Sequence, residues 1–284
     1  MSCYLCNSEN YFKRSGSVRD DSSIDVLECG DCGLVYLSSL GHIKEGHYEE
    51  SGMHSEEIKI EKWLEECKED DNRRYQFVMN KINNKVILDF GCGAGGFIEI
   101  VNQRNNIAKG IELEIALQSS FKKRGLVVFP NILEAQKEGL KYDLITAFHV
   151  VEHLQHPIKV IQELSNLLKD QGEIIIEVPN SDDALFTLYE NNDFQDFSYW
   201  SQHVFLFNKK TITELIKQSG LKLNWIKHVQ RYPLSNHLYW MAKGRPGGHI
   251  KWSYLDNNEL NIEYEKQLAN ICKTDTIMVG ISKP

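Results

Sequence analysis

Four cysteines near the start of the chain form two Cys-x-x-Cys pairs, Cys3 with Cys6 and Cys29 with Cys32. Four thiolates in such pairs supply the tetrahedral sulfur set, at metal–sulfur distances of about 2.3 Å, that a structural zinc ion prefers. A closed four-cysteine site has no free coordination position, so we expect this zinc to stabilise rather than catalyse. Four unrelated core cysteines are the alternative. The remaining cysteines lack matching partners and are expected to be buried thiols: Cys67, Cys92 and Cys272.

A glycine-rich turn, VILDFGCGAGGF at residues 86–97, joins an apolar strand pattern to a helical pattern. Glycines at such a junction let a ligand approach the backbone closely. The next apolar run ends in GIELE, and its Glu112 lies about 20 residues after the turn, where a carboxylate can accept both hydroxyls of a ribose. The turn is not a P-loop, because no Gly-Lys-Ser/Thr ends it. Taken alone, it also suits an ordinary tight loop.

The stretch HVVEH, residues 149–153, spells the H-x-x-E-H pattern that on a helix holds zinc beside a catalytic glutamate. Such a protease needs both histidines on one face of a helix. Here the motif follows DLITAF, a buried-strand pattern, and Pro157 marks the start of the next helix. This position disfavours a metalloprotease. We expect Glu152 and His153 to fix the turn by hydrogen bonds, and His149 to edge a substrate cavity.

The elements that must position these residues follow from the apolar runs. Short runs (VILDF, IAKGIEL, LVVF, DLITAF, EIIIEV) alternate with helical segments such as PIKVIQELSNLLK, which indicates a parallel sheet covered on both faces. A helix is predicted ahead of them at residues 56–82. A capping box of Thr211 and Glu214 is expected to open the helix TITELIKQS. Two late strands flank a predicted helix near residues 259–271.

Composition and charge bound the class of protein. The 284 residues are 42% hydrophobic and 25% charged, which suits one sizeable domain with a small appendage. The net charge of −8 argues against a large nucleic-acid partner, which usually requires a basic face. No apolar run approaches the roughly 20 residues of a membrane span, and the start MSCYLCNSEN lacks signal-peptide features. We therefore expect no membrane insertion and a reducing cytoplasm, where thiols bind metals more often than they form disulfides.

Several of these segments resemble class I S-adenosylmethionine-dependent methyltransferases. DFGCGAGG is similar to their first motif and GIELE to their ribose-binding strand end, while KYDLITAFHVVEHLQHP and LLKDQGEIIIEVPN resemble their fourth-strand and fifth-strand segments. The similarity covers roughly residues 85–230. It implies an α/β fold, a Rossmann-like, seven-stranded, mostly parallel sheet with helices on both faces and an antiparallel last strand. We expect a small zinc ribbon at residues 1–40 and the methyltransferase domain at residues 41–284, with a helical lead-in over 41–84.

The resemblance also implies which residues hold S-adenosylmethionine. The glycine turn and its aspartate would line the methionine and sugar portions, and the acidic strand end would hold the ribose. One asparagine falls where the family often contacts adenine, and an aromatic residue and His149 fall at the end of the fourth strand. The implied cofactor-binding residues are Asp89, Gly91, Gly93, Gly95, Glu112, Asn131 and Phe148.

Cysteine pairs ahead of this domain resemble a bacterial group of methyltransferases that act on nucleotide-linked sugars or surface polysaccharides. The shared features are CGLVYL, GHYEESG, SQHVFLFN and DTIMVGISKP. In sugar C-methyltransferases of this group a Glu-His pair carries the acid–base work. His203 matches the histidine, but Gln202 stands where the glutamate would be. A hydroxyl acceptor needs only one proton removed, which one histidine can do. We therefore favour O-methylation of a sugar, with His203 as base and His149 as the reserve candidate.

Other interpretations stay open. The chain could methylate a sugar carbon, or it could methylate rRNA or tRNA through a ribbon that recognises RNA. A non-catalytic scaffold that only senses the cofactor is a third class, and His203 could be purely structural. Tyr48 is a further candidate for the cavity wall. The sequence determines neither the acceptor nor the oligomeric state. The aromatic residues around His203 suit sugars, bases and core packing alike: Phe194, Phe197, Tyr199, Trp200, Phe205 and Phe207.

Overall fold

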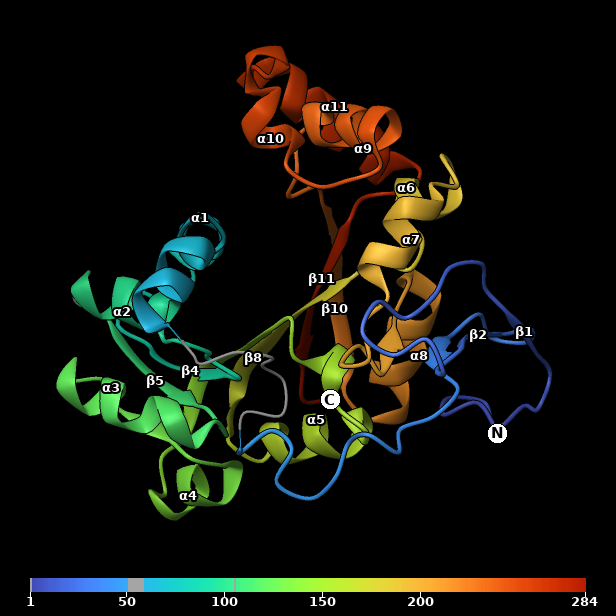
Figure 1. The fold of residues 1–284 in the computed structure, drawn as a ribbon. Helices are drawn as coiled ribbons and strands as arrows, with labels where there is room; N and C mark the ends of the chain where they lie inside the picture. Colours follow the sequence, from blue (N-terminus) through green and yellow to red (C-terminus); the bar gives the residue numbers. More distant parts are fainter. Residues whose placement is uncertain (1, 51–58, 105) are drawn as a thin grey trace.

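The protein is described here from a computed structural model that covers residues 2–50, 59–104 and 106–284 (Figure 1). Its centre is a seven-stranded sheet in the order β10-β11-β8-β7-β4-β5-β6. Within this sheet β4, β5, β6, β7 and β8 are parallel, and β11 is antiparallel to both of its neighbours. The predicted sheet, with its antiparallel last strand, is confirmed. The strands are β4 (Val86–Phe90), β5 (Ile107–Ile111), β6 (Val128–Phe129), β7 (Tyr142–Phe148), β8 (Leu168–Pro179), β10 (Lys222–Val229) and β11 (Thr276–Ser282).

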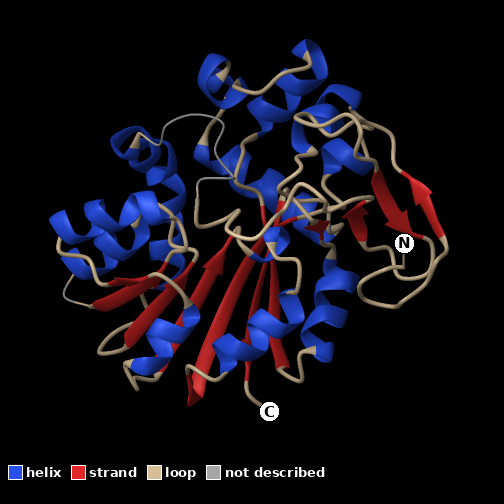
Figure 2. Cartoon of the chain, turned by 60° about the horizontal axis from the view of Figure 1, so that its bottom comes forward, coloured by secondary structure: helices blue, strands red, loops and turns tan. Residues whose placement is uncertain are grey.

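Both faces of the sheet are buried, as a parallel sheet requires. Consecutive strand residues point to opposite faces. In β8, Ile174 and Ile176 lie in one apolar cluster and Ile175 in another, and all three are fully buried. Helices flank the sheet on both sides (Figure 2). The first face packs residues of α4 (Ile132–Lys137), α5 (Pro157–Ser165) and α8 (Lys209–Gln218), and the second packs residues of α1 (Ile60–Val78), α2 (Gly96–Gln103) and α3 (Gln118–Lys123).

The N-terminal segment forms a second, four-stranded antiparallel sheet. Three strands come from the segment itself and the fourth from the chain beyond β8. Val35 pairs with Leu206 and Tyr36 with Phe205. The ribbon is therefore bonded to the larger part of the chain, while the predicted domain boundary at residue 40 stays a prediction. The strands are β1 (Tyr11–Lys13), β2 (Val26–Cys29), β3 (Val35–Leu37) and β9 (Phe205–Leu206).

Two helical insertions lie at the carboxyl end of the sheet. One follows β8 and the other joins β10 to β11, at the top of Figure 1. The predicted helix near residues 259–271 and its flanking strands are confirmed, whereas α9 has no counterpart among the sequence predictions. No helix in the described ranges is both long and apolar enough to cross a membrane. The inserted helices are α6 (Ala184–Thr187), α7 (Asn192–Ser198), α9 (Leu234–Lys243), α10 (Gly248–Lys251), η3 (Ser253–Leu255) and α11 (Asn258–Asn270).

One helix start differs from the sequence prediction, and another falls partly outside the described residues. The first helix begins at Ile60, and residues 56–58 of its predicted span, like the end of GHYEESG, lie outside the described residues. The predicted capping box of Thr211 and Glu214 was wrong. Asn208 is the N-cap of α8: its side chain accepts from the Thr211 amide at 3.0 Å, and the Thr211 hydroxyl accepts from the Asn208 amide at 2.8 Å. Asparagine is a preferred N-cap residue and its side chain accepts from the Thr211 amide, so the helix begins three residues earlier than predicted.

Candidate functional site

The glycine turn connects β4 to α2 at the carboxyl edge of the sheet, where open α/β sheets bind ligands. Gly91, Gly93 and Gly95 have φ angles of 68°, 52° and 82°, in the left-handed region that favours glycine. The amide of Gly91 donates to the carbonyl of Ile111 at 2.8 Å, which fastens the turn to the end of β5. The sequence therefore folds here into a tight turn whose backbone conformation favours glycine.

We expect Gly91→Ala to destabilise the protein by about 1–3 kcal/mol beyond the backbone strain alone, because its Cβ would lie 2.4 Å from Val150. Gly125 is a matched control, since it has the same φ of +68° and no atom within 4 Å of an added Cβ. Denaturant unfolding of both alanine variants measures the difference. Equal losses of unfolding free energy would show that the turn tolerates a side chain.

Glu112 follows β5 and faces the glycine turn. Its carboxylate accepts hydrogen bonds from the amide of Gly93 at 2.8 Å and from the amide of Glu114 at 3.0 Å. Burial raises the pKa of Glu112 in spite of these bonds, which favour the charged form. The structure thus brings together the two features that the sequence assigned to cofactor binding. Each carboxylate oxygen keeps a further lone pair for a ligand hydroxyl.

Three other predicted cofactor residues have identified local partners. The carboxylate of Asp89 is buried and accepts from the hydroxyl of Thr146 at 2.6 Å, and burial raises the pKa of Asp89 to about 7. Phe148, at the end of β7, is buried edge-to-face against Phe97, with ring centroids 5.3 Å apart. Asn131 is exposed and caps α4. Asp89 therefore braces the strands beneath the turn, and the ligand contacts of all three stay predictions.

HVVEH does not form one helix. His149 directly follows β7 with a φ of +55°, and the motif continues into the short 3-10 helix η2 (Val151–His153). The His149 Nδ1 is 3.1 Å from a Glu152 oxygen, and its Nε2 is 3.1 Å from a Glu177 oxygen. Burial and Arg231 oppose protonation, but these two carboxylates raise the pKa of His149. The metalloprotease geometry is absent, and the predicted hydrogen bonding of Glu152 is confirmed.

Sequence reasoning missed a buried ion cluster beside this turn. Glu177, on β8, has no exposed surface and lies 2.9 Å from the guanidinium groups of both Arg73 and Arg74. Although burial alone would raise it, Arg74 and His149 hold the pKa of Glu177 well below its usual range. These contacts fasten α1 to the central sheet. The arginines belong to a helix with no motif, so only Glu177, which follows three isoleucines in the run EIIIEV, signalled the cluster.

His203 lies just before β9 and meets HVVEH from the other side. Its ring centroid is 5.0 Å from that of His153 and 5.4 Å from that of Trp200. Its Nδ1 is buried and has no hydrogen-bond partner among the described residues. Burial, together with His153, lowers the pKa of His203 to about 3. The two histidine motifs, far apart in sequence, therefore form one cluster.

Hydrogen bonds with Gln202 and Tyr48 fix the position of His153 in this cluster. The His153 Nδ1 donates to the carbonyl of Gln202 at 2.8 Å, and the Tyr48 hydroxyl donates to the carbonyl of His153 at 2.6 Å. The Gln202 side chain lies 2.7 Å from the Nε2 of His47. The half-buried Tyr48 thus contacts the turn after β7, while Gln202 is occupied by another histidine rather than paired with His203.

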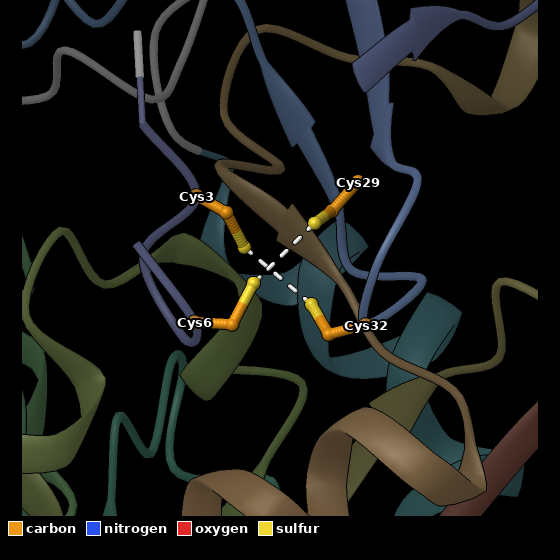
Figure 3. Close-up of side chains that lie close together, drawn as sticks. All are labelled: Cys3, Cys6, Cys29 and Cys32. Carbon is orange, nitrogen blue, oxygen red and sulfur yellow. Dashed lines mark hydrogen bonds between the residues drawn. The ribbon is translucent and has the colours of Figure 1, made fainter. Parts of the chain in front are cut away.

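The four N-terminal cysteines converge as predicted (Figure 3). The Cys3 and Cys32 sulfurs are 3.5 Å apart, those of Cys6 and Cys29 are 3.4 Å apart, and all four lie within 4.8 Å of one another. Sulfurs 2.3 Å from a tetrahedral metal lie about 3.8 Å apart, so the cluster fits a zinc ion. Of the remaining cysteines, Cys92 is buried, and Cys67 and Cys272 are half-buried.

Comparison with known proteins agrees with this geometry. The sequence model of a family described as "Methyltransferase domain" matches residues 62–224, more than half of the chain. An uncharacterised protein of Methanocaldococcus jannaschii is 27% identical over 159 residues, which is 55% of this chain and 64% of that protein. The ubiquinone biosynthesis O-methyltransferase of Haemophilus ducreyi is 30% identical over 123 residues, 38% of this chain and 52% of that enzyme. The chain thus spans between half and two thirds of these relatives.

A solved structure shows the same fold. The crystal structure of a SAM-dependent methyltransferase from Archaeoglobus fulgidus superposes with a TM-score of 0.50 and 20% sequence identity, and the match covers 79% of this chain and 95% of that one. At this level of identity the likeness concerns the fold alone.

Proposed function

This chain belongs to the methyltransferase-domain family, and from that premise we propose that it transfers a methyl group from S-adenosylmethionine to a hydroxyl of a small molecule, in particular a sugar. The observation that carries the proposal is the position of the Glu112 carboxylate, which accepts a hydrogen bond from the amide of Gly93 in the glycine turn. A carboxylate at this strand end suits a ribose diol. When bound, S-adenosylmethionine supplies an electrophilic methyl group on a positively charged sulfur.

The residues present fit this cofactor. The turn leaves no room for side chains, since a Cβ at Gly91 or Gly93 would lie 2.4 Å or 3.0 Å from a neighbouring side chain. The close packing against Val150 and Trp63 therefore requires glycine at both positions. Glu112 would hold the ribose hydroxyls, and the glycines would lie along the sugar and methionine portions. Asn131, exposed after β6, remains the candidate for adenine.

A hydroxyl acceptor is supported by the surroundings of His203. Tyr48 and Trp200, whose ring carries Arg19 on one face, are half-buried beside the histidine cluster, and aromatic rings of this kind suit the apolar faces of sugar rings. Gln202 offers no carboxylate, and its amide is bonded to His47, so a paired acid–base device for carbon methylation is missing from this position. The name of the Haemophilus ducreyi relative also specifies oxygen methylation.

We assign the loss of the acceptor's proton to His203. The pKa of about 3 keeps this imidazole neutral and able to accept a proton, but it also makes His203 a weak base, so the assignment rests on its position and on its unpartnered Nδ1. His149 is the weaker candidate, because each of its ring nitrogens lies 3.1 Å from a buried carboxylate oxygen. The chain's own contribution is to align the acceptor and to take this proton.

RNA methylation is disfavoured by the ribbon. Two of its three basic residues are engaged within the protein: Arg14 lies 3.2 Å from Glu28, and the Arg19 guanidinium stacks 4.7 Å over Trp200, whereas Lys13 forms an exposed ion pair with Asp25. A ribbon that binds the phosphate backbone needs free cations on its surface.

Calorimetry with S-adenosylmethionine tests the proposal. Glu112→Ala should weaken binding by about 2 kcal/mol, roughly thirtyfold, because both acceptor oxygens are lost. Glu134→Ala, which removes a carboxylate from the exposed first turn of α4, should bind like the wild type. Equal affinities for Glu112→Ala and the wild type would show that the ribose lies elsewhere. A folded wild-type protein that does not bind the cofactor would overturn the proposed function.

A further inference from the structure

A carboxylate and two imidazoles meet beside the candidate acceptor site. Glu152, His153 and His203 each offer one ligand atom, and these atoms lie within 4.8 Å of one another. Glu152 and His153 come from η2, while His203 comes from the loop before β9. The group is distinct from the four cysteines, because it shares no residue with them and consists of nitrogen and oxygen donors.

Two of these side chains hold buried atoms without partners. The second oxygen of Glu152 and the Nδ1 of His203 have no hydrogen-bond partner in the part of the chain that the structure describes. Glu152 is fully buried. An isolated buried carboxylate oxygen is costly, and native proteins rarely leave one unsatisfied. A cation at this point would satisfy both atoms at once.

Hydrogen bonds from neighbouring residues fix the side chains of His153 and Glu152, as they usually do for metal ligands. Because the His153 Nδ1 donates to the carbonyl of Gln202 at 2.8 Å, its Nε2 keeps a free lone pair. The other oxygen of Glu152 is held by the His149 Nδ1 at 3.1 Å. Metal-binding histidines and carboxylates are usually fixed by outer contacts of these kinds.

We propose that Glu152, His153 and His203 bind a divalent transition-metal ion. Two imidazoles and one carboxylate are borderline donors that suit Mn²⁺, Fe²⁺, Co²⁺ or Zn²⁺ and leave coordination positions open. Metal–ligand bonds of about 2.0–2.2 Å would draw the three donor atoms to within roughly 3–4 Å of one another. Small rotations of the two half-buried imidazoles would achieve this.

The role of the ion rests on the proposed function. Its open positions would take oxygen atoms of the acceptor, which favours an acceptor with two neighbouring oxygens, such as a vicinal diol. A hydroxyl bound to a divalent cation has a lowered pKa and needs no imidazole base. A coordinated His203 would therefore act as a ligand, whereas an uncoordinated His203 would act as the base.

Mn²⁺ is the probe for the experiment, because it prefers nitrogen and oxygen donors to thiolates. Electron paramagnetic resonance counts the free Mn²⁺ during titration of protein whose zinc content has been measured. The wild type should bind about one equivalent. Glu152→Gln and His203→Ala should each weaken binding at least ~10–100-fold, the loss typical of even an outer metal-site contact. His156→Ala, which removes an exposed imidazole close by in sequence, should bind like the wild type.

Two results would overturn the metal site. One is a folded wild type that binds neither Mn²⁺ nor Co²⁺, and the other is undiminished binding by folded Glu152→Gln and His203→Ala proteins. Cofactor calorimetry on the same samples reports folding and tests the proposed function separately. Methyl transfer that survives chelation, with the cysteine-bound zinc still present, would refute the role of the ion and leave the function intact. A protein that binds the metal but not the cofactor would refute the proposed function and leave the metal site intact.

Discussion

Cys6→Ser should destabilise the N-terminal ribbon on the order of 3 kcal/mol or more, although the Cys6 side chain is exposed. An exposed thiol contributes little packing, so the loss would report its bond to a metal. Metal ligation is coupled to folding because the unfolded segment has no preformed site. Purified wild type should contain about one equivalent of zinc bound by the four cysteines, and the variant should contain much less.

Unfolding of the ribbon should also disturb the candidate active site. β3 pairs with β9, and Phe205 begins β9 two residues after His203. The Asp20 carboxylate accepts from the hydroxyl of Ser201 at 2.7 Å, which fixes the same loop. Cys6→Ser should therefore become sensitive to proteolysis in the ribbon and lose turnover, while it still binds the cofactor.

Cys67→Ser is the control, because it makes the same chemical change in a half-buried helical residue remote from the cluster. It should keep its zinc and melt close to the wild type. Elemental analysis and thermal melting decide between the two variants. A wild type with less than about half an equivalent of zinc, and a melting curve unchanged by chelation, would contradict a structural metal.

The strands of the sheet could be predicted because the sequence pattern that specifies each strand lies within the strand itself. Short apolar runs that alternate with helical periodicity specify buried parallel strands, and Gly91, Gly93 and Gly95 mark a strand-to-helix turn with left-handed backbone. Glu112 follows from its distance to that turn. The inserted position of β11 came from the family resemblance, since no local pattern specifies which strand pairs with which.

The histidine cluster could not be predicted in the same way. Its members come from η2 and from the loop before β9, and tertiary contacts such as the hydrogen bond between His153 and the Gln202 carbonyl bring His203 against His153. The ion cluster around Glu177 depends equally on tertiary contacts, because Arg73 and Arg74 look like ordinary surface positions of a helix. Local periodicity identifies elements, whereas charges that neutralise one another in the interior appear only when the elements are packed.

The second large effect is expected for His203→Ala, which should lower the rate of methyl transfer by about a hundredfold to ten-thousandfold. A sugar hydroxyl is a poor nucleophile while it keeps its proton. The loss is expected whether His203 takes that proton itself or holds the cation that makes the proton acidic. Cofactor affinity should stay unchanged, since the Glu112 carboxylate and the glycine turn are bonded to each other and His203 takes no part in that contact.

Turnover of candidate sugars, followed by mass spectrometry for the added methyl group, measures this loss. His156→Ala controls for removal of an imidazole, and the zinc content of His203→Ala checks that the adjoining ribbon remains folded. A variant that keeps more than about a third of the wild-type rate would clear His203 of any part in deprotonation. Alignment of the acceptor with the methyl group would then be the whole of the chain's contribution, because proximity alone can supply several kcal/mol of the barrier.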